Sequence, residues 1–455
     1  MSSESLSQSL LFDPADPKAA LAQLPQSTAV FALYGADAHA EPYVGRTPNL
    51  RARLERLLQP SARHPRRLQL AGRVRRIEWR LTGSEFESLL AQFSLLEQIY
   101  GSKSLERMHL GHPAFVRFLG GNPYPRITVT HRPSQREADW AYGPFASRAV
   151  AERYAEEALK LFLLRRCTFE LAPDPSYPGC VYSEMKMCLA PCYKGCTDER
   201  YAEEAAAVES FLATRGDSRL VVLRTQRDQA SANLEFESAA ALHAQVQRVE
   251  SVRALAPELV RPLSQLRAVI LQASAESGEV AVYLFERSRL RGPAGLSTLG
   301  MRIQNEQSGS TSLFAQPMTL EPVPEEQGPG TRDVGTSRQG SELGDQAEGS
   351  PWRGTERSLS GAGETSAPGH GKLVRGMLEA RLEALLDALG EGSGAPSATV
   401  RQGHLALLKR WYYRPEARRA GEIFFPDSDG RWPVKAILRG AGRVAAKMLT
   451  GGFSS

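Results

Sequence analysis

Residues 321–371 divide the chain and limit how it can fold. This segment contains no Ile, Phe, Tyr or Met and is rich in Gly, Ser, Glu and Pro. It cannot bury enough apolar surface to offset the loss of chain entropy, so we expect a disordered linker. The whole chain has 455 residues, too many for a single core. We therefore expect several folded units before the linker and a basic, mostly helical region after it, at residues 372–455.

The first unit is expected to be a small α/β domain at residues 25–105. Two strand-like segments joined by a turn-rich stretch form a hairpin, and the Leu residues that follow recur with helical spacing. Asn49 and Ser84 stand where each of two helices needs its N-cap. The expected strands are 28–34, 41–45 and 73–81, and the expected helices cover 50–58 and 84–100.

Arginine is concentrated in residues 46–80, which hold eleven Arg, no Lys and two acidic residues. The guanidinium fork binds phosphate oxygens through two parallel hydrogen bonds, which favours a nucleic-acid surface. Arg exceeds Lys nearly everywhere in the chain, so a coding bias is the alternative. The residues predicted to bind nucleic acid are Arg51, Arg56, Arg66, Arg67 and Arg73.

The remaining chain alternates between helical and strand-like patterns. Residues 198–216 and 222–253 predict two long helices that pair in an antiparallel hairpin, and residues 266–287 predict a β-hairpin. Residues 437–449 predict a glycine turn before a basic helix, with a phosphate-binding helix-hairpin-helix as the alternative. The expected organisation is 1–24 flexible, 25–105 α/β, 106–166 connecting α/β, 167–196 Cys-rich, 197–255 helical hairpin, 256–320 β-rich, 321–371 linker and 372–455 helical.

All five cysteines fall within 30 residues, and four of them, Cys167, Cys180, Cys188 and Cys192, have the spacing C-x12-C-x7-C-x3-C. The start of the chain lacks a signal-peptide pattern and no apolar run is long enough to span a membrane, so we expect a cytoplasmic protein. In a reducing compartment clustered thiols are more typical of metal sites than of disulfides. Four thiolates suit zinc or an iron–sulfur cluster, and the spacing does not distinguish them.

Several motifs occur in a familiar order. They are a hairpin ending in YVG, the helix "NLRARL", "YGPF" at 142–145, "KLFLLRRC", "CVYSEMKMCLAPC" and "NLEFESAAALHAQV". Together they resemble the N-terminal half of the UvrC family, the nuclease subunits of bacterial nucleotide excision repair. The resemblance covers residues 25–255 and implies a GIY-YIG domain that cuts DNA on the 3′ side, a 4Fe-4S cluster on the cysteines, and a UVR motif that binds UvrB.

The resemblance also implies a catalytic set for the 3′ site. Tyr43 matches the tyrosine of YIG, Arg53 matches the essential arginine, and Arg46 replaces the following lysine. Phe31 stands in place of the GIY tyrosine, and Gln92 stands where the family has its metal-binding Glu. A neutral amide binds Mg²⁺ more weakly than a carboxylate does, so we expect a degenerate incision site.

The alternative is an active endonuclease, dependent on Mg²⁺ or Mn²⁺, with a rebuilt metal site. Glu85 precedes Gln92 by two helical turns and shares its face, about 10 Å away along the axis. Glu87 and Glu97 point elsewhere. None of these carboxylates is a close replacement for the missing ligand.

The UVR-like motif provides two apolar anchors, Leu234 and Phe236, for a UvrB-like partner. The competing interpretation places both side chains in the core of an intramolecular hairpin. After residue 260 the β-rich segment could be a remnant of the family's RNase H-like domain, but no Asp/His catalytic set follows it. The resulting hypothesis is a DNA-binding, UvrC-like protein that interacts with UvrB and lacks the 5′ nuclease.

Overall fold

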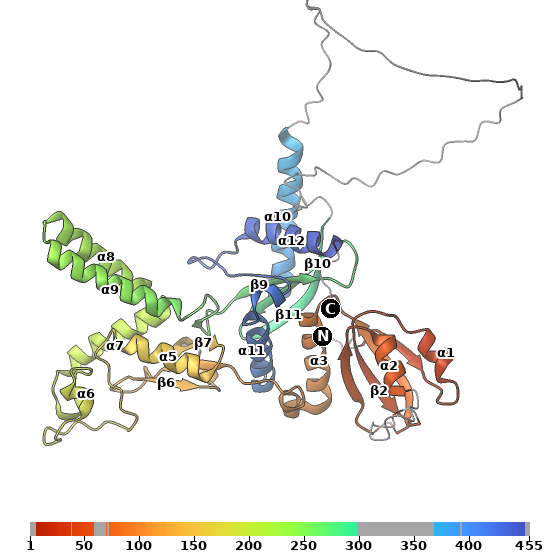
Figure 1. Cartoon of the computed structure of the whole chain (residues 1–455), viewed down its shortest axis with the longest axis horizontal. Helices are drawn as coiled ribbons and strands as arrows, with labels where there is room; N and C mark the ends of the chain where they lie inside the picture. Colours follow the sequence, from red (N-terminus) through yellow and green to blue (C-terminus); the bar gives the residue numbers. More distant parts are fainter. Residues whose placement is uncertain are drawn as a thin grey trace, which may run out of the picture.

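The computed structural model describes residues 6–37, 39–58, 70, 72–298, 368–391 and 394–450. It is a mixed α/β structure, in line with the predicted fold class. Three antiparallel four-stranded sheets lie in a row with helices packed on them (Figure 1). None of the described helices is long and apolar enough to cross a membrane. Most of the predicted linker lies outside the described residues, and α10 begins inside its expected end, at Pro368.

The N-terminal sheet has the strand order β1-β4-β2-β3. The predicted hairpin, third strand and two helices are all present. Asn49 Oδ1 accepts the Ala52 amide at 2.9 Å, and Ser84 Oγ accepts the Glu87 amide at 3.1 Å, so both predicted residues cap their helices. The elements are β1 Gln8–Leu11, α1 Pro17–Ala22, β2 Ala29–Gly35, β3 Tyr43–Thr47, α2 Leu50–Leu58, β4 Val74–Leu81, α3 Glu85–Tyr100 and α4 Ser104–Arg107.

The first residues differ from expectation, because residues 8–22 form β1 and α1 rather than a flexible tail. β1 pairs with β4, and Phe12 and Leu21 are 3 % and 1 % exposed in the core between the sheet, α1 and α2. Burial of these two large apolar side chains stabilises the segment. The composition of the first residues does not indicate this burial.

The sheet formed by the middle of the chain, named the middle sheet although it lies at one end of the row (Figure 1), has the order β6-β5-β7-β8 and is covered by α5 and α7. Its fourth strand, β8, comes from the chain after the helical hairpin, so the hairpin is an excursion that starts from this layer and returns to it. The elements are β5 Ala114–Phe118, β6 Ile127–Thr130, β7 Ala141–Phe145, α5 Arg148–Leu159, α6 Val181–Glu184, α7 Asp198–Ala213, α8 Asp217–Ala232, α9 Phe236–Ala254 and β8 Arg261–Pro262.

The helical hairpin is formed by α8 and α9, not by the two segments predicted to pair. The chain expected to be one helix at 222–253 breaks between Ala232 and Phe236, where Leu234 has a left-handed φ of 60°. Helical periodicity continues across this break, so the pattern does not reveal it. Ion pairs join the two helices from Arg224 to Glu250 at 2.6 Å and from Arg253 to Asp217 at 2.7 Å. Figure 1 shows the hairpin extending away from the sheets.

The third sheet has the order β11-β10-β9-β12 and combines segments from both sides of the predicted linker. The predicted β-hairpin is present as β9 and β10, and β12 pairs with β9 from the C-terminal region. The elements are β9 Ala268–Ala273, β10 Glu279–Glu286, β11 Arg289–Ser297, α10 Pro368–Gly390, α11 Ala398–Tyr412, β12 Glu422–Phe424 and α12 Val434–Leu449.

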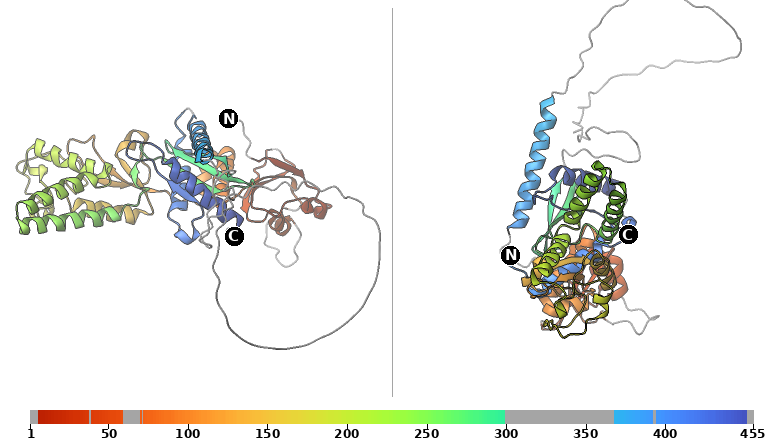
Figure 2. Two further views of the ribbon diagram at one scale, coloured as in Figure 1. Left: turned by 90° about the horizontal axis from the view of Figure 1, so that it is seen from above. Right: turned by 90° about the vertical axis from the view of Figure 1, so that its left-hand side faces the viewer.

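Helices cover both faces of this sheet. Ile270 and Tyr283 face α3 and α11, whereas Leu271 and Val282 face α10 and α12. Strands buried on both faces are apolar at successive positions, which explains the uninterrupted run at 268–271. Figure 2 shows α10 standing beside the sheet from two further directions.

Helix α3 belongs to two cores at once. One side of it packs on the N-terminal sheet through Leu95, and the other packs against α11, where the rings of Phe93 and His404 are 5.5 Å apart. The C-terminal region therefore shares a core with the N-terminal unit. Residues 437–449 are also corrected, because α12 runs through them without a turn. Gly440 lies where helix and strand approach closely, since a Cβ there would be 2.5 Å from the Phe424 ring.

The α3–α11 contact can be tested at Gly403, whose added Cβ would lie 2.0 Å from the Phe93 ring. Gly403→Ala is expected to lower the free energy of unfolding by about 1–3 kcal/mol through overpacking. Gly376→Ala in α10 is the matched control, because no described atom from outside its own helical turn lies within 4 Å of its Cβ position. The control is expected to be neutral or to stabilise by up to about 1 kcal/mol through helix propensity. Equal melting temperatures for Gly403→Ala and the wild type would contradict this packing.

Candidate functional site

Tyr43 and Arg53, the two residues that match the predicted incision site, lie on the same side of the N-terminal sheet. Tyr43 is on the edge strand β3 and packs against the core that includes α2, with its ring 6.2 Å from that of Phe31. Arg53 is on α2, which holds this face of the sheet through Leu50 and Leu54. Phe31 is fully buried and has no hydroxyl, so it serves the core. The Phe31 ring leaves no room for a side chain at Gly45, because a Cβ there would lie 2.7 Å from the ring.

Arg46 and Gln92 lie on the opposite face. Alternation along β3 turns Val44 and Arg46 toward α3, where Val44 packs against the cluster that includes Leu95 of α3. Gln92 follows Ala91 on α3 and is half-buried. The predicted catalytic residues are thus divided between the two faces of β3. Since β3 is an edge strand, both faces border the same edge of the sheet.

Two carboxylates at the start of α3, Glu85 and Glu87, are bound by arginines and a backbone amide. Arg414 donates to both oxygens of Glu85 at 2.7 Å, and Arg46 lies 3.4 Å from the same carboxylate. The hydrogen bonds from Arg414 hold the pKa of Glu85 below its usual range. Glu87 is 4 % exposed and accepts from the Gly83 amide at 2.9 Å and from Arg80 at 3.2 Å. Burial raises the pKa of Glu87.

The arginines predicted to bind nucleic acid differ in their exposure and in the hydrogen bonds that they already make. Arg51 Nε donates to the Leu24 carbonyl at 2.7 Å, so this side chain ties α2 to the preceding loop. Arg56 is exposed on α2 and donates to Ala52 within its own helix, and Arg73 is exposed before β4. Arg66 and Arg67 lie outside the described residues.

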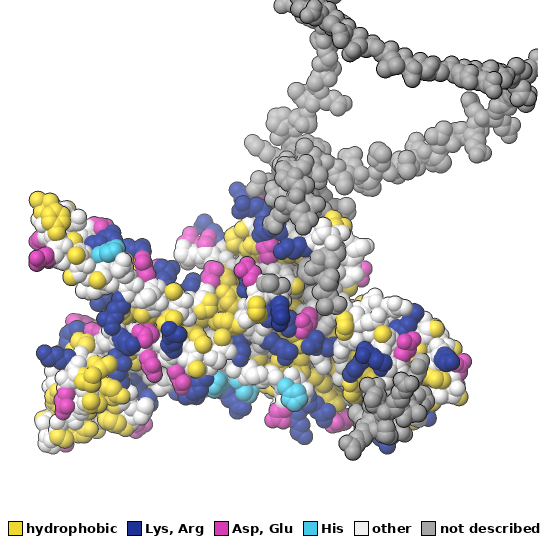
Figure 3. Space-filling view, viewed as in Figure 1, with side chains coloured by type: hydrophobic (Ala, Val, Ile, Leu, Met, Phe, Trp, Pro, Cys, Tyr) yellow, Lys and Arg dark blue, Asp and Glu magenta, His cyan; other side chains and the backbone are white. Residues whose placement is uncertain are grey.

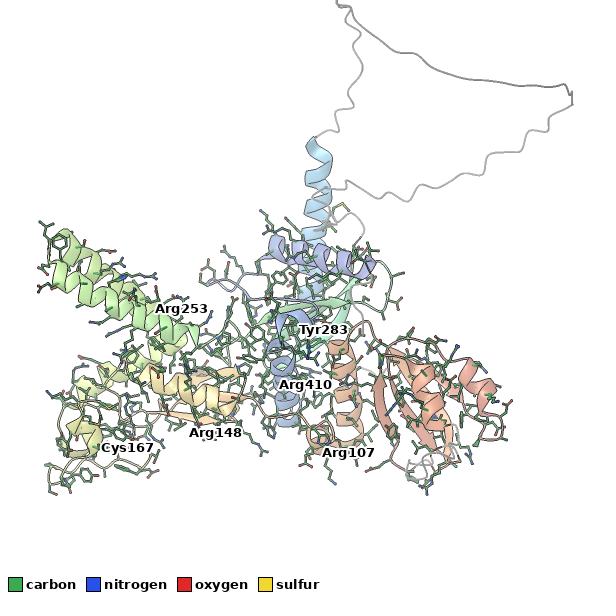
Figure 4. All side chains as sticks on the ribbon, in the orientation of Figure 1. Arg107, Arg148, Cys167, Arg253, Tyr283 and Arg410 are labelled. Atoms are coloured by element: carbon green, nitrogen blue, oxygen red, sulfur yellow. The ribbon has the colours of Figure 1, made fainter. Side chains whose placement is uncertain are left out.

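The four predicted cysteine ligands line one small pocket. Figure 4 labels Cys167 in this part of the molecule. The Ala190 amide donates to Cys188 Sγ at 3.3 Å. Burial raises the pKa of Cys188 to about 11, and the negative charge of the neighbouring thiolates adds to the increase. Cys196 is not among the pocket-lining residues.

The thiol groups of these four cysteines are not arranged as a complete metal-binding site. No group of three or more His, Cys, Asp or Glu side chains within the described ranges is arranged to hold a metal ion. The four cysteines therefore share the walls of one pocket without converging on a single centre.

Arg165 gives this pocket a positive charge that sequence analysis did not identify. It is 1 % exposed, and it donates to the Tyr124 and Phe169 carbonyls at 2.9 Å each and to Cys167 Sγ at 3.5 Å. Its Nη2 is buried without a hydrogen-bond partner in the described part of the chain. A buried guanidinium with an unused donor fits an anionic metal–thiolate group, because such a group would supply the missing acceptor.

Leu234 and Phe236 lie at the turn between α8 and α9 and are 71 % and 67 % exposed. Figure 3 shows apolar side chains at the tip of the projecting hairpin. The interpretation that buries them in the hairpin's own core is wrong, since Leu220 and Val249 form that core further down the helices. Two large exposed apolar side chains on a projecting turn form a candidate contact surface.

The middle of the chain is similar to a known protein family. Residues 115–211 match the family model described as the UvrC/Cho excinuclease middle domain. UvrABC system protein C of Alcanivorax borkumensis is 30 % identical over 239 residues, covering 52 % of this chain and 39 % of the relative. The Ruminiclostridium cellulolyticum protein is 27 % identical over 267 residues, covering 58 % and 43 %. The Shigella dysenteriae protein is 29 % identical over 243 residues, covering 53 % and 41 %.

The matched part of the chain thus spans about two fifths of the length of these curated relatives. No solved structure matches the chain significantly.

Proposed function

Because the chain is a UvrC-like protein, we propose that it binds DNA in nucleotide excision repair and has a degenerate 3′ incision site. In this proposal the arginines of the N-terminal unit contact DNA phosphates. The cysteine pocket holds a metal centre, and the α8–α9 hairpin binds a UvrB-like partner. Each part rests on a separate set of side chains and has its own test.

The degenerate incision site is supported chiefly by the surroundings of Gln92. Mg²⁺ prefers anionic oxygen ligands in near-octahedral geometry, and the Gln92 amide supplies only a neutral oxygen. Glu85 does not offer a substitute, because two arginines hold its carboxylate. Glu87 is buried at the start of α3, and its carboxylate accepts hydrogen bonds from the Gly83 amide and from Arg80. A metal-dependent attack on a phosphodiester would therefore lack its carboxylate ligand.

One observation favours the alternative of an active repair nuclease. Tyr43 and Arg53 lie on the same side of the sheet, as an incision site would require, with α2 packed directly on that face. A metal-binding side chain at position 92 would then complete this catalytic set from the other face of β3. The two functions differ only in whether the metal is held.

A nicking assay separates these functions. The wild type is expected not to incise a lesion-bearing duplex with Mg²⁺ or Mn²⁺, in the presence or absence of UvrB. Gln92→Glu is expected to raise the nicking rate by at least roughly tenfold, because it restores an anionic ligand. Gln98→Glu adds the same charge to an exposed position of α3 and is expected to change nothing. Wild-type nicking that disappears in Tyr43→Phe and Arg53→Ala would instead establish the active enzyme.

The metal centre is proposed on Cys167, Cys180, Cys188 and Cys192, with a 4Fe-4S cluster implied by the family resemblance and zinc as the alternative. The shared pocket and the amide donated to Cys188 Sγ support this ligand set. Arg165 would orient Cys167 and offset the negative charge of four thiolates, using the Nη2 that lacks an acceptor. When bound, the centre would cross-link segments of a loop-rich region that has little core of its own.

This proposal predicts the metal content of the purified full-length protein. Anaerobically purified wild type is expected to contain iron and acid-labile sulfide, or one zinc per chain. Cys188→Ser is expected to lose most of this metal, whereas Cys196→Ser keeps it because Cys196 does not line the pocket. Arg165→Gln is expected to release metal to a chelator roughly 10- to 100-fold faster, as for an outer-shell partner. Equal metal content in Cys188→Ser and wild type would rule out this ligand set.

The partner-binding proposal predicts a local effect at the hairpin tip. Leu234→Ser combined with Phe236→Ser is expected to weaken binding to UvrB by at least roughly 30-fold, since exposed apolar anchors often dominate such interfaces. Val221→Ser, at another exposed apolar position of the hairpin, is the matched control. Binding can be measured by calorimetry with purified UvrB. Equal affinities of the tip variant and Val221→Ser would show that the tip is not the contact.

A further inference from the structure

A set of basic side chains crosses the α11 region from the N-terminal sheet to the middle sheet. We name it the basic strip and define it as Arg46, Lys409, Arg410 and Arg414, with His112, His131 and Arg132 at its far end. These residues come from three parts of the chain that are distant in sequence. Figure 3 shows Lys, Arg and His side chains gathered over the central lower part of this face, and Figure 4 labels Arg410 on α11.

At the first end three guanidinium groups surround one carboxylate. Arg414 and Arg46 both contact Glu85, at 2.7 and 3.4 Å. Burial lowers the pKa of Arg46, and the positive charges of Arg410 and Arg414 lower it further, against the effect of Glu85. One carboxylate cannot neutralise three guanidinium groups, so this end keeps a net positive charge.

At the other end the cations are held near backbone carbonyls. Lys409 Nζ lies 3.5 Å from the carbonyl oxygens of both Gly111 and His112. Burial lowers the pKa of His112, and Arg132, His131 and Lys409 lower it further. The positive charges of Lys409 and Arg132 thus disfavour protonation of His112, and the same charges favour a bound anion at this end.

The strip is also held rigidly. Tyr413 Oη donates to the Pro144 carbonyl at 2.9 Å, and Arg401 Nη2 donates to the Pro133 carbonyl at 3.3 Å, so α11 is tied to the middle sheet. Its other side packs on α3 through Phe93. Cations placed in advance lose less conformational entropy when they bind a ligand.

We infer that the basic strip binds the sugar-phosphate backbone of a DNA duplex and extends the arginine surface of the N-terminal unit across α11. This inference rests on the proposed DNA-binding function and specifies the path of the DNA. A single phosphate would satisfy one end of the strip, whereas a polyanion can contact both. Arg46, on the edge strand β3, belongs both to the strip and to the arginine-rich segment at residues 46–80.

The test measures the affinity of the full-length protein for a lesion-free duplex by fluorescence anisotropy, over about 50 to 200 mM salt. Arg410→Gln and Arg132→Gln are each expected to weaken binding roughly 3- to 10-fold and to reduce the slope of log K against log salt by about 0.9. Both residues are exposed, so their loss should leave the fold intact. Arg439→Gln removes the same charge from an exposed site on α12, across the sheet from α11, and is expected to keep the wild-type slope.

The outcomes distinguish the strip from the function on which it rests. If the wild type binds DNA with a steep salt dependence but Arg410→Gln and Arg132→Gln behave like Arg439→Gln, the strip is overturned and DNA binding stands. If the wild type shows no salt-dependent binding, the proposed DNA-binding function fails and the strip fails with it. Circular dichroism and melting temperature of each variant confirm that the fold is retained.

Discussion

The burial of β9 and β10 on both faces is the constraint on which the remaining structure depends. Strands with no solvent-facing side need helices above and below them. Within the described ranges, the residues that follow β10 form β11, and the covering helices come from other parts of the chain. α3 and α11 cover one face, and α10 and α12 cover the other. An N-terminal helix and a C-terminal helix are thereby brought into contact.

This contact shapes the candidate incision site. The helix that carries Gln92 also packs on α11, and the segment after α11 places Arg414 on Glu85. A carboxylate on the same helix, two turns before Gln92, thus anchors the C-terminal region. A Glu85 carboxylate bound by two arginines would be a poor ligand for a cation, which is compatible with the proposed degenerate metal position at Gln92. The same arrangement exposes the cations of α11 beside β3.

Local features of the fold were predictable from the sequence. Asn49 and Ser84 cap their helices, and the two predicted hairpin pairings, β2–β3 and β9–β10, are present, because caps and strand patterns depend on nearby residues. The break at Leu234 was not predictable, since the helical pattern continues through it. The Arg414–Glu85 pair joins residues 329 positions apart, and no local pattern indicates such a pairing. Arg165 stands next to a recognised cysteine, but its burial appears only in three dimensions.

The projecting α8–α9 hairpin has a consequence for how ligands share the molecule. α9 has 19 residues, so at 1.5 Å per residue the apolar tip stands about 28 Å from the base of the hairpin. Helix α11, which carries Lys409 and Arg410 of the basic strip, lies away from that tip (Figure 1). A protein held at one location and a polyanion held at the other would not compete for space. The chain would then set the distance between two separately bound macromolecules.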